Sequence, residues 1–255
     1  MSITDKFRMN GQVAIVTGAA AGIGRGIAEA FAAAGCAVVV SDLSLEKAQA
    51  VASDIRDKGG MAMGTVCNVV EENDRVALVN AAVECFGGLT CLVNNAGGGG
   101  PKPFDMPMSD FEWAYQLNVF APFRLMQLCA PHIAKKGGGS ILNISSMSGD
   151  NKNMRMASYA SSKAAISHLT RNTAFDLGPS NIRVNAIAPG AIRTAALATV
   201  LTPEIEKAML KHTPLKRLGE PEDIGLAALF LCSPASVWVS GQVLTVSGGG
   251  VQELD

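Results

Sequence analysis

Short runs of apolar, mostly β-branched residues alternate with stretches of helical periodicity along nearly the whole chain. The apolar runs lie at 13–17, 37–41, 63–67, 90–94, 140–144, 182–187 and 242–246. Helical stretches are expected between them at 23–34, 44–58, 71–86, 109–135, 157–178 and 221–232. Continuous apolar strands have no polar face, which is typical of a parallel sheet covered by helices on both sides. The alternation therefore predicts an α/β fold, a doubly wound parallel sheet of seven strands.

The alternation also predicts a single domain over residues 1–255, because no repeat, low-complexity tract or linker interrupts it. The longest departure is segment 190–220, which has helical spacing and contains Pro203 and Pro214. Long excursions from a compact domain are commonly functional. We therefore expect segment 190–220 to be a lid over the substrate.

Composition excludes several classes of protein. The 21 Lys and Arg residues nearly balance the 22 Asp and Glu residues, so a nucleic-acid partner bound through phosphate contacts is not expected. The uncharged stretch 224–252 contains Ser233-Pro234 and Gly241, which break it too often for a membrane span. The 6 Cys show no CxxC spacing and the 3 His are isolated, so no metal site is expected. Buried free thiols in a reducing cytoplasm are the favoured interpretation of the cysteines.

A glycine-rich string follows the first predicted strand and opens the first predicted helix. Glycines at such a turn allow backbone N–H groups to approach a pyrophosphate at the positive end of the helix. The residues assigned to the cofactor here are Gly18, Gly22, Ile23 and Gly24, with Asp42 and Leu43 at the end of the second strand. A carboxylate at that position accepts hydrogen bonds from an adenosine ribose diol and repels a 2′-phosphate, and no Lys or Arg lies within 18–24. The sequence therefore predicts NAD rather than NADP.

A second group of polar residues follows the fifth strand. Tyr159 and Lys163 are four residues apart in a predicted helix and share one face. A nearby ammonium lowers the pKa of a phenol, which would make Tyr159 a usable acid or base. Ser146 ends the fifth strand, at the sheet edge where ligands bind, and its hydroxyl could donate to an oxygen that gains charge.

Together, Thr17–Gly24, Asn94-Asn95-Ala96-Gly97, Ser146, Tyr159, Lys163 and Pro189-Gly190 resemble the short-chain dehydrogenase/reductase family over the whole chain. The resemblance implies a Rossmann-type fold and a catalytic set of Asn118, Ser146, Tyr159 and Lys163. In that set Tyr159 is the acid/base, Lys163 also binds the nicotinamide ribose, Ser146 orients the substrate oxygen, and Asn118 holds a water for proton relay. The resemblance adds cofactor contacts at Asn68, Val69, Asn95, Tyr159, Lys163, Ile192, Arg193 and Thr194. One departure is Asn68, where the family usually has Asp; an amide oxygen is a weaker acceptor for the adenine amine.

Several loop segments resemble those of family members that act on the 7α-hydroxyl of bile-acid-type steroids. These segments are 97–108, 151–153, 202–206, 237–242 and 247–254. The resemblance implies an NAD-dependent oxidoreductase with a steroid site formed by Gly99, Ser146, Asn151 and Tyr159. Alternatively, these loops only brace the cofactor pocket.

Two further functions remain in view. A reductase of another ketone, or of a 3-oxoacyl thioester, would use the same residues but normally prefers NADPH. A nucleotide-binding regulatory protein without turnover would not need Tyr159 or Ser146.

The family resemblance also implies a homotetramer, because relatives pair the region around 224–252 with its copy in another subunit.

Overall fold

In the part of the chain that the structure describes, seven strands run parallel in one sheet, in the order β3-β2-β1-β4-β5-β6-β7. The computed structural model describes residues 2–152, 154–199 and 201–250. The strands are β1 (Val13–Thr17), β2 (Ala37–Asp42), β3 (Met61–Val66), β4 (Cys91–Asn94), β5 (Gly139–Ile144), β6 (Ile182–Pro189) and β7 (Val243–Val246). This confirms the predicted single-domain, doubly wound sheet, with strand ends that differ from the prediction by one or two residues.

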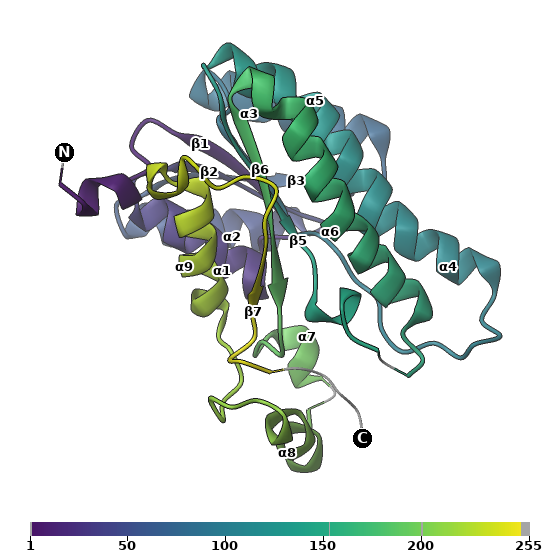
Figure 1. Cartoon of the computed structure of the whole chain (residues 1–255). Helices are drawn as coiled ribbons and strands as arrows, with labels where there is room; N and C mark the ends of the chain where they lie inside the picture. The colour runs from purple at the N-terminus through teal and green to yellow at the C-terminus, as the bar shows by residue number, and fades with distance from the viewer. Residues whose placement is uncertain (1, 153, 200, 251–255) are drawn as a thin grey trace.

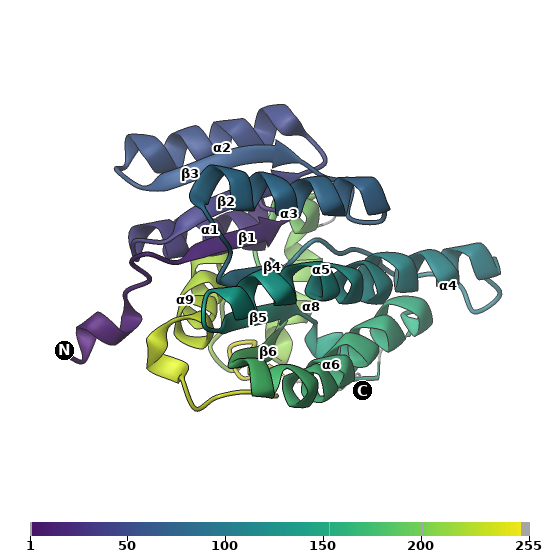
Figure 2. The same cartoon turned by 90° about the horizontal axis from the view of Figure 1, so that it is seen from above.

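Helices cover both faces of the sheet (Figures 1 and 2). On one face lie α1 (Gly22–Ala33), α2 (Leu45–Asp57) and α9 (Pro221–Cys232), and on the other lie α3 (Glu72–Phe86), α5 (Ala121–Lys135) and α6 (Ala157–Leu177). Successive side chains of a strand point to opposite faces, so Val16 and Val38 pack in the first core while Ile15 and Val39 pack in the second. Because both faces are covered, the strands carry no alternating polar pattern.

The predicted helix 109–135 is not continuous. The structure divides it into α4 (Met108–Tyr115), a π-helical turn (Gln116–Phe120) and α5. Pro122 explains the interruption, because its ring clashes with the carbonyl four residues earlier and it has no N–H to donate there. That carbonyl belongs to Asn118, and π-turns of this kind are frequent at functional sites.

Segment 190–220 contains two short helices, α7 (Ala195–Ala198) and α8 (Pro203–Lys211), which lie beyond the carboxyl ends of β6 and β7 (Figure 1). Its two ends are joined by main-chain hydrogen bonds, from Arg193 N to Gly219 O at 2.7 Å and from Gly219 N to Ala191 O at 2.9 Å. The two ends of this excursion, called the flap below, are therefore held together, and its predicted role as a lid over the substrate stays a prediction. Of the loop segments singled out above, Asn153 and residues 251–254 lie outside the described residues.

The carboxyl ends of the strands gather the predicted site residues at one edge of the sheet. The glycine turn follows β1, Asp42 ends β2, Asn68 follows β3, Asn95 follows β4 and Ser146 follows β5. In open α/β sheets, ligands bind in the crevice at this edge. The fold thus places residues from distant parts of the chain along one crevice.

Candidate active site

The glycine turn after β1 needs glycine for two separate reasons. Gly18 and Gly22 have φ angles of 61° and 53°, which side chains rarely adopt. A side chain at Gly24 would collide with the backbone of the turn itself. At the start of α1, the N-cap residue Ala21 makes no side-chain cap bond and the first helical turn has no acidic residue. The first N–H groups of α1 therefore suit an anion such as a pyrophosphate, while Ile23 packs against the core beneath.

Asn95 braces this turn from the neighbouring strand. Its Nδ2 donates to Thr17 O at 2.8 Å and to Gly18 O at 3.0 Å. The Thr17 hydroxyl in turn accepts from the N–H groups of Asn95 and Ala96 at 3.1 and 3.0 Å. The amide of Asn95 is thus directed at the turn, and its predicted place near the nicotinamide ribose stays a prediction.

Asp42 presents a carboxylate where β2 ends. One oxygen accepts from the Ala20 N–H at 3.1 Å, and the other lies 3.4 Å from the Ser44 N–H. Leu43 is exposed. Arg25 lies just after the turn, but its guanidinium binds a carboxylate on α1 at 3.0 Å and one on α2 at 2.9 Å. The region around Asp42 therefore suits a ribose diol better than a phosphate.

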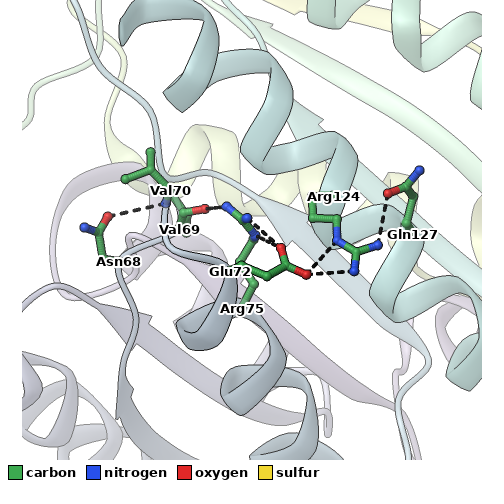
Figure 3. A network of polar contacts seen from close by, with 7 residues as sticks. All are labelled: Asn68, Val69, Val70, Glu72, Arg75, Arg124 and Gln127. Carbon is green, nitrogen blue, oxygen red and sulfur yellow. Dashed lines mark hydrogen bonds and ion pairs between the residues drawn. The ribbon is translucent and has the colours of Figure 1, made fainter.

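The loop after β3 is held mostly by its own backbone and by α3 (Figure 3). The Asn68 side-chain oxygen accepts from the Val70 N–H at 3.4 Å, and the Asn68 N–H donates to Asp74 at 2.8 Å. Val69 accepts a hydrogen bond from Arg75 through its carbonyl. The adenine contacts predicted for Asn68 and Val69 remain predictions.

Ser146, Tyr159 and Lys163 come together where β5 ends and α6 begins. Lys163 is buried; its Nζ donates to Ile144 O at 2.8 Å and lies 5.8 Å from the centre of the Tyr159 ring. Ser146 caps a short helix (Met147–Gly149), with its hydroxyl accepting from the Ser148 N–H at 3.1 Å. The Ser146 hydroxyl also lies close enough to Tyr159 to exert a lowering effect on its pKa. The predicted group of three is thus assembled in one place.

The two titrating groups differ from the expectation in one respect. Burial raises the pKa of Tyr159 above its ordinary value, against the smaller lowering effect of the nearby Ser146 hydroxyl. Burial also lowers the pKa of Lys163 to about 8. The predicted lowering of the Tyr159 pKa by the Lys163 ammonium is therefore wrong for the protein alone. Both groups are taken out of water, which penalises the charged form of each.

Asn118 lies on the π-helical turn with its side chain fully engaged. The Oδ1 atom accepts from Gly98 N at 3.1 Å, and Nδ2 donates to Gly98 O at 2.9 Å and to Ser162 Oγ at 3.0 Å. An amide in that state has little capacity left for a water. The predicted water site at Asn118 therefore depends on its backbone carbonyl, for which Pro122 supplies no helical donor.

The two predicted steroid-flanking residues lie on loops that contact one another. Lys102 N donates to Arg155 O at 2.7 Å, which joins the loop after β4 to the loop after β5. Gly99 has a φ of 138°, and a side chain there would approach the Tyr159 ring to 2.6 Å. Asn151 is half-buried and donates its N–H to Met147 O at 3.2 Å. Gly99 is therefore in direct contact with the catalytic region, whereas Asn151 borders it.

Segment 192–194 after β6 is divided between the core and the flap. Ile192 is buried in the first core. The Arg193 guanidinium binds Glu206 of α8 at 2.9 Å and Glu220 at 3.2 Å. Thr194 caps α7 by accepting from Leu197 N at 3.2 Å, and its methyl group would lie 3.1 Å from a side chain at Gly22. Of the three, Thr194 lies against the glycine turn, while the side chains of the other two are engaged elsewhere.

Two residues of this region were not predicted. Ser162 receives the Asn118 amide, and Gly98 pairs with Asn118 through both of its backbone groups. Ser162 stands inside the string Ser158–Lys163, between the two predicted catalytic residues, so its position on the helix was a usable signal. The pairing of Gly98 depends on a tertiary contact that no local pattern reveals.

Three further observations concern metal binding, membrane spans and the state of the cysteines. Among the described residues, no group of three or more His, Cys, Asp or Glu side chains could hold a metal ion. Within the same residues, no helix has both the length and the apolarity that crossing a membrane requires. All six cysteines are free thiols, and five are buried as expected, whereas Cys85 is exposed.

Comparisons with known proteins agree with this arrangement. Residues 18–250 match the family described as enoyl-(acyl carrier protein) reductase. The chain is 61% identical over 252 residues to 7α-hydroxysteroid dehydrogenase of Escherichia coli K12, covering 99% of each protein. It is 37% identical over 246 residues to a 3-oxoacyl-(acyl-carrier-protein) reductase of Aquifex aeolicus, covering 96% of this chain and 99% of the relative. A solved 7α-hydroxysteroid dehydrogenase, complexed with NADH and 7-oxo glycochenodeoxycholic acid, superposes with a TM-score of 0.97 at 60% identity over 100% of both chains.

Proposed function

The chain belongs to the short-chain dehydrogenase/reductase family, and from this premise we propose that it oxidises the 7α-hydroxyl of bile-acid-type steroids with NAD as hydride acceptor. The observation that carries the proposal is the assembly of Ser146, Tyr159 and Lys163 beside Gly99, in a chain that matches a 7α-hydroxysteroid dehydrogenase over its full length. A purely nucleotide-binding protein has no need of a half-buried phenol next to a buried ammonium. The site is therefore that of an enzyme.

The residues at the crevice fit NAD. Gly18 and Gly22 hold the turn in left-handed conformations at the open N-terminus of α1, where a pyrophosphate is favoured. The Asp42 carboxylate lies beside this turn, where it can accept hydrogen bonds from a ribose diol, and Arg25 is occupied by two carboxylates. NAD, when bound, supplies the carbon that accepts the hydride.

The catalytic residues then handle the proton and the substrate oxygen. The Tyr159 hydroxyl oxygen, once ionised, accepts the proton of the steroid hydroxyl. The Ser146 hydroxyl donates a hydrogen bond to the oxygen of the steroid. Lys163 holds its ammonium near the Tyr159 ring from its anchor on Ile144 O. Because burial raises the pKa of Tyr159, oxidation is expected to accelerate as the pH rises above neutral.

Product analysis tests the proposal. Cholate or chenodeoxycholate should give only the 7-ketone, because hydride transfer needs the reacting carbon about 3–3.5 Å from the nicotinamide and a rigid ring system cannot present a second hydroxyl there. The 3α, 12α and 7β hydroxyls should remain unchanged. A 3-keto product, or no reaction with any bile acid, would contradict the assignment.

The reductase alternative has one observation in its favour, the 37% identity to a 3-oxoacyl-(acyl-carrier-protein) reductase. Acetoacetyl thioesters with NADPH should be poor substrates, since the Asp42 carboxylate is expected to repel a 2′-phosphate. Faster turnover of the thioester than of any bile acid would favour the alternative.

We further propose a homotetramer in the cytoplasm. Large apolar side chains stand on the surface: Trp238 is 98% exposed, Phe175 90% and Val237 69%. Single chains rarely leave such side chains in water unless they bind something, and closed symmetric assembly is the common way to cover them. Sedimentation at micromolar concentration tests the assembly, and a stable monomer would contradict it.

The six free thiols support the proposed location in a reducing compartment. Fractionation of cells that express the protein would test this location.

A further inference from the structure

A chain of charged side chains connects the loop after β3 with the start of α5 (Figure 3). Arg75 on α3 donates to Val69 O and also binds Glu72, at 3.2 Å through Nε and 2.6 Å through Nη2. The other oxygen of Glu72 accepts from Nε and Nη2 of Arg124 on α5, at 2.9 and 2.7 Å. Arg124 also donates through Nη1 to Gln127 Oε1 at 3.2 Å. One carboxylate therefore joins two guanidinium groups from different helices.

The two ends of this chain differ in exposure. The Arg75 side chain is only 11% exposed, whereas those of Glu72 and Arg124 are 46% and 42% exposed. Arg75 is therefore the member that depends most on its partners, because a cation withdrawn from water needs a carboxylate and good acceptors. Both flanking arginines lower the pKa of Glu72 to about 2, so the carboxylate stays ionised in ordinary buffers.

The loop that Arg75 holds lies beside Asp42. The Cys67 N–H donates to Asp42 O at 2.9 Å, which places the start of the loop directly next to the end of β2. From the other side, Asp74 on α3 accepts the Asn68 N–H at 2.8 Å. In a doubly wound sheet of this order, the loops after β2 and β3 wall the adenosine end of the dinucleotide crevice. The Asn68 side chain carries no charge. The hydrogen-bonding groups that the loop presents to the adenosine half therefore depend on the conformation of its backbone.

We propose that Arg75, Glu72 and Arg124 are positioning residues for the cofactor: Arg75 fixes loop 68–70, Glu72 fixes Arg75, and Arg124 anchors both to α5. The proposal rests on NAD being the cofactor, as proposed above. Without the Glu72 carboxylate, Arg75 would keep only the Val69 carbonyl as a partner and the loop would lose its lateral support. The loss should therefore appear in binding of the adenosine half of NAD.

Calorimetric titration of the full chain with NAD and with ADP-ribose tests the proposal without any turnover. Glu72→Gln should raise the Kd of both ligands about fivefold, a modest effect because the ion pairs are partly exposed. The KM for NAD should rise in parallel, whereas kcat at saturating NAD should change much less. Glu71→Gln is the matched control, because Glu71 makes no side-chain cap bond at the start of α3 and should bind ADP-ribose like the wild type.

A double-mutant cycle separates positioning from general damage. Arg124→Gln should raise the Kd about twofold, and Glu72→Gln/Arg124→Gln should bind no more weakly than Glu72→Gln, since both changes remove the same anchor. Unchanged ADP-ribose binding in Glu72→Gln, an equal loss in Glu71→Gln, or additive losses in the cycle would each overturn the proposal. Because no steroid is present, an error in the 7α-assignment leaves these outcomes intact, whereas a wild-type chain that binds no NAD would overturn both proposals.

Discussion

The glycine turn and the flap 190–220 border the same crevice but are held in place by different forces. Around the turn, backbone and short side chains are packed so closely that a side chain at Gly18 would lie 3.1 Å from both Ala96 Cα and Asn95 Nδ2. In the flap, α8 buries no residue, and Arg193 binds Glu206 with both side chains partly exposed. Steric exclusion works at any ionic strength, whereas exposed ion pairs are weak and screened by salt. We therefore expect the glycine turn to be the more rigid of the two, and the flap to be the one whose position responds to salt.

The largest effect should come from neither wall but from Tyr159, which is half-buried at the start of α6. Tyr159→Phe removes the phenolic oxygen while keeping the ring, so kcat should fall by about 10³-fold or more, near the upper range for acid–base catalysis. NAD binding, measured by titration, should change little, because only the proton path is lost. Near-normal turnover would remove Tyr159 from the mechanism.

The next effect concerns cofactor choice at Asp42. Hydrogen bonds to a charged group contribute about 1.5–3 kcal/mol, so the wild type should favour NAD over NADP by on the order of 10²-fold in kcat/KM. Asp42→Ala should narrow this ratio, because the carboxylate that repels a 2′-phosphate is gone. Equal rates of the wild type with both cofactors would contradict this role of Asp42.

A smaller effect is expected from overpacking the turn. In Gly24→Ala the new methyl group meets the backbone of Gly18 and Ala19, which cannot move aside, so the free energy of unfolding should fall by about 1–3 kcal/mol. Denaturant titration measures it. Gly178→Ala is the control, because nothing lies within 4 Å of a side chain there. If both variants are equally stable, the turn is not rigid.

The smallest effect should come from the flap. Arg193→Gln breaks two exposed ion pairs, so the KM for the steroid should rise only about two- to fivefold. Added salt should raise the wild-type KM toward that of the variant, since it screens the same ion pairs. Lys47→Gln, on α2, is the control for loss of one surface charge. If neither the substitution nor added salt changes the KM for the steroid, Arg193 does not hold the flap over the substrate.

The sequence predicted the sheet well because its strands are buried on both faces. Runs such as Val13–Thr17 and Ala37–Asp42 are apolar except at their carboxyl ends, and glycine marks the turn that follows the first of them. The polar residues at the strand ends, Asp42 and Ser146, could be placed from that pattern alone. Once the strands are known, parallel pairing brings their carboxyl ends together.

What the sequence did not reveal depends on contacts between distant segments. Helix 109–135 was predicted without a break, although Pro122 was a usable signal for one. The pairing of Asn118 with Gly98 needs the loop after β4 to fold over it. The pKa of Tyr159 is raised by burial. The spacing of apolar residues in the sequence does not reveal how deeply a residue at the start of a helix is buried. Arg193 was assigned to the cofactor from the family resemblance, whereas its guanidinium binds the carboxylates of Glu206 and Glu220.

The contact between Gly99 and Tyr159 has a practical consequence for redesign of the enzyme. A side chain at position 99 would require an unfavourable φ of 138° and would approach the phenol ring to 2.6 Å, so libraries at this position should yield mostly inactive variants. One residue further along, Gly100 has nothing within 4 Å of a side chain and no restricted φ. Position 100 is thus where the loop beside Tyr159 has room for a new side chain, and where we expect variants with altered substrate preference to keep their acid–base group in place.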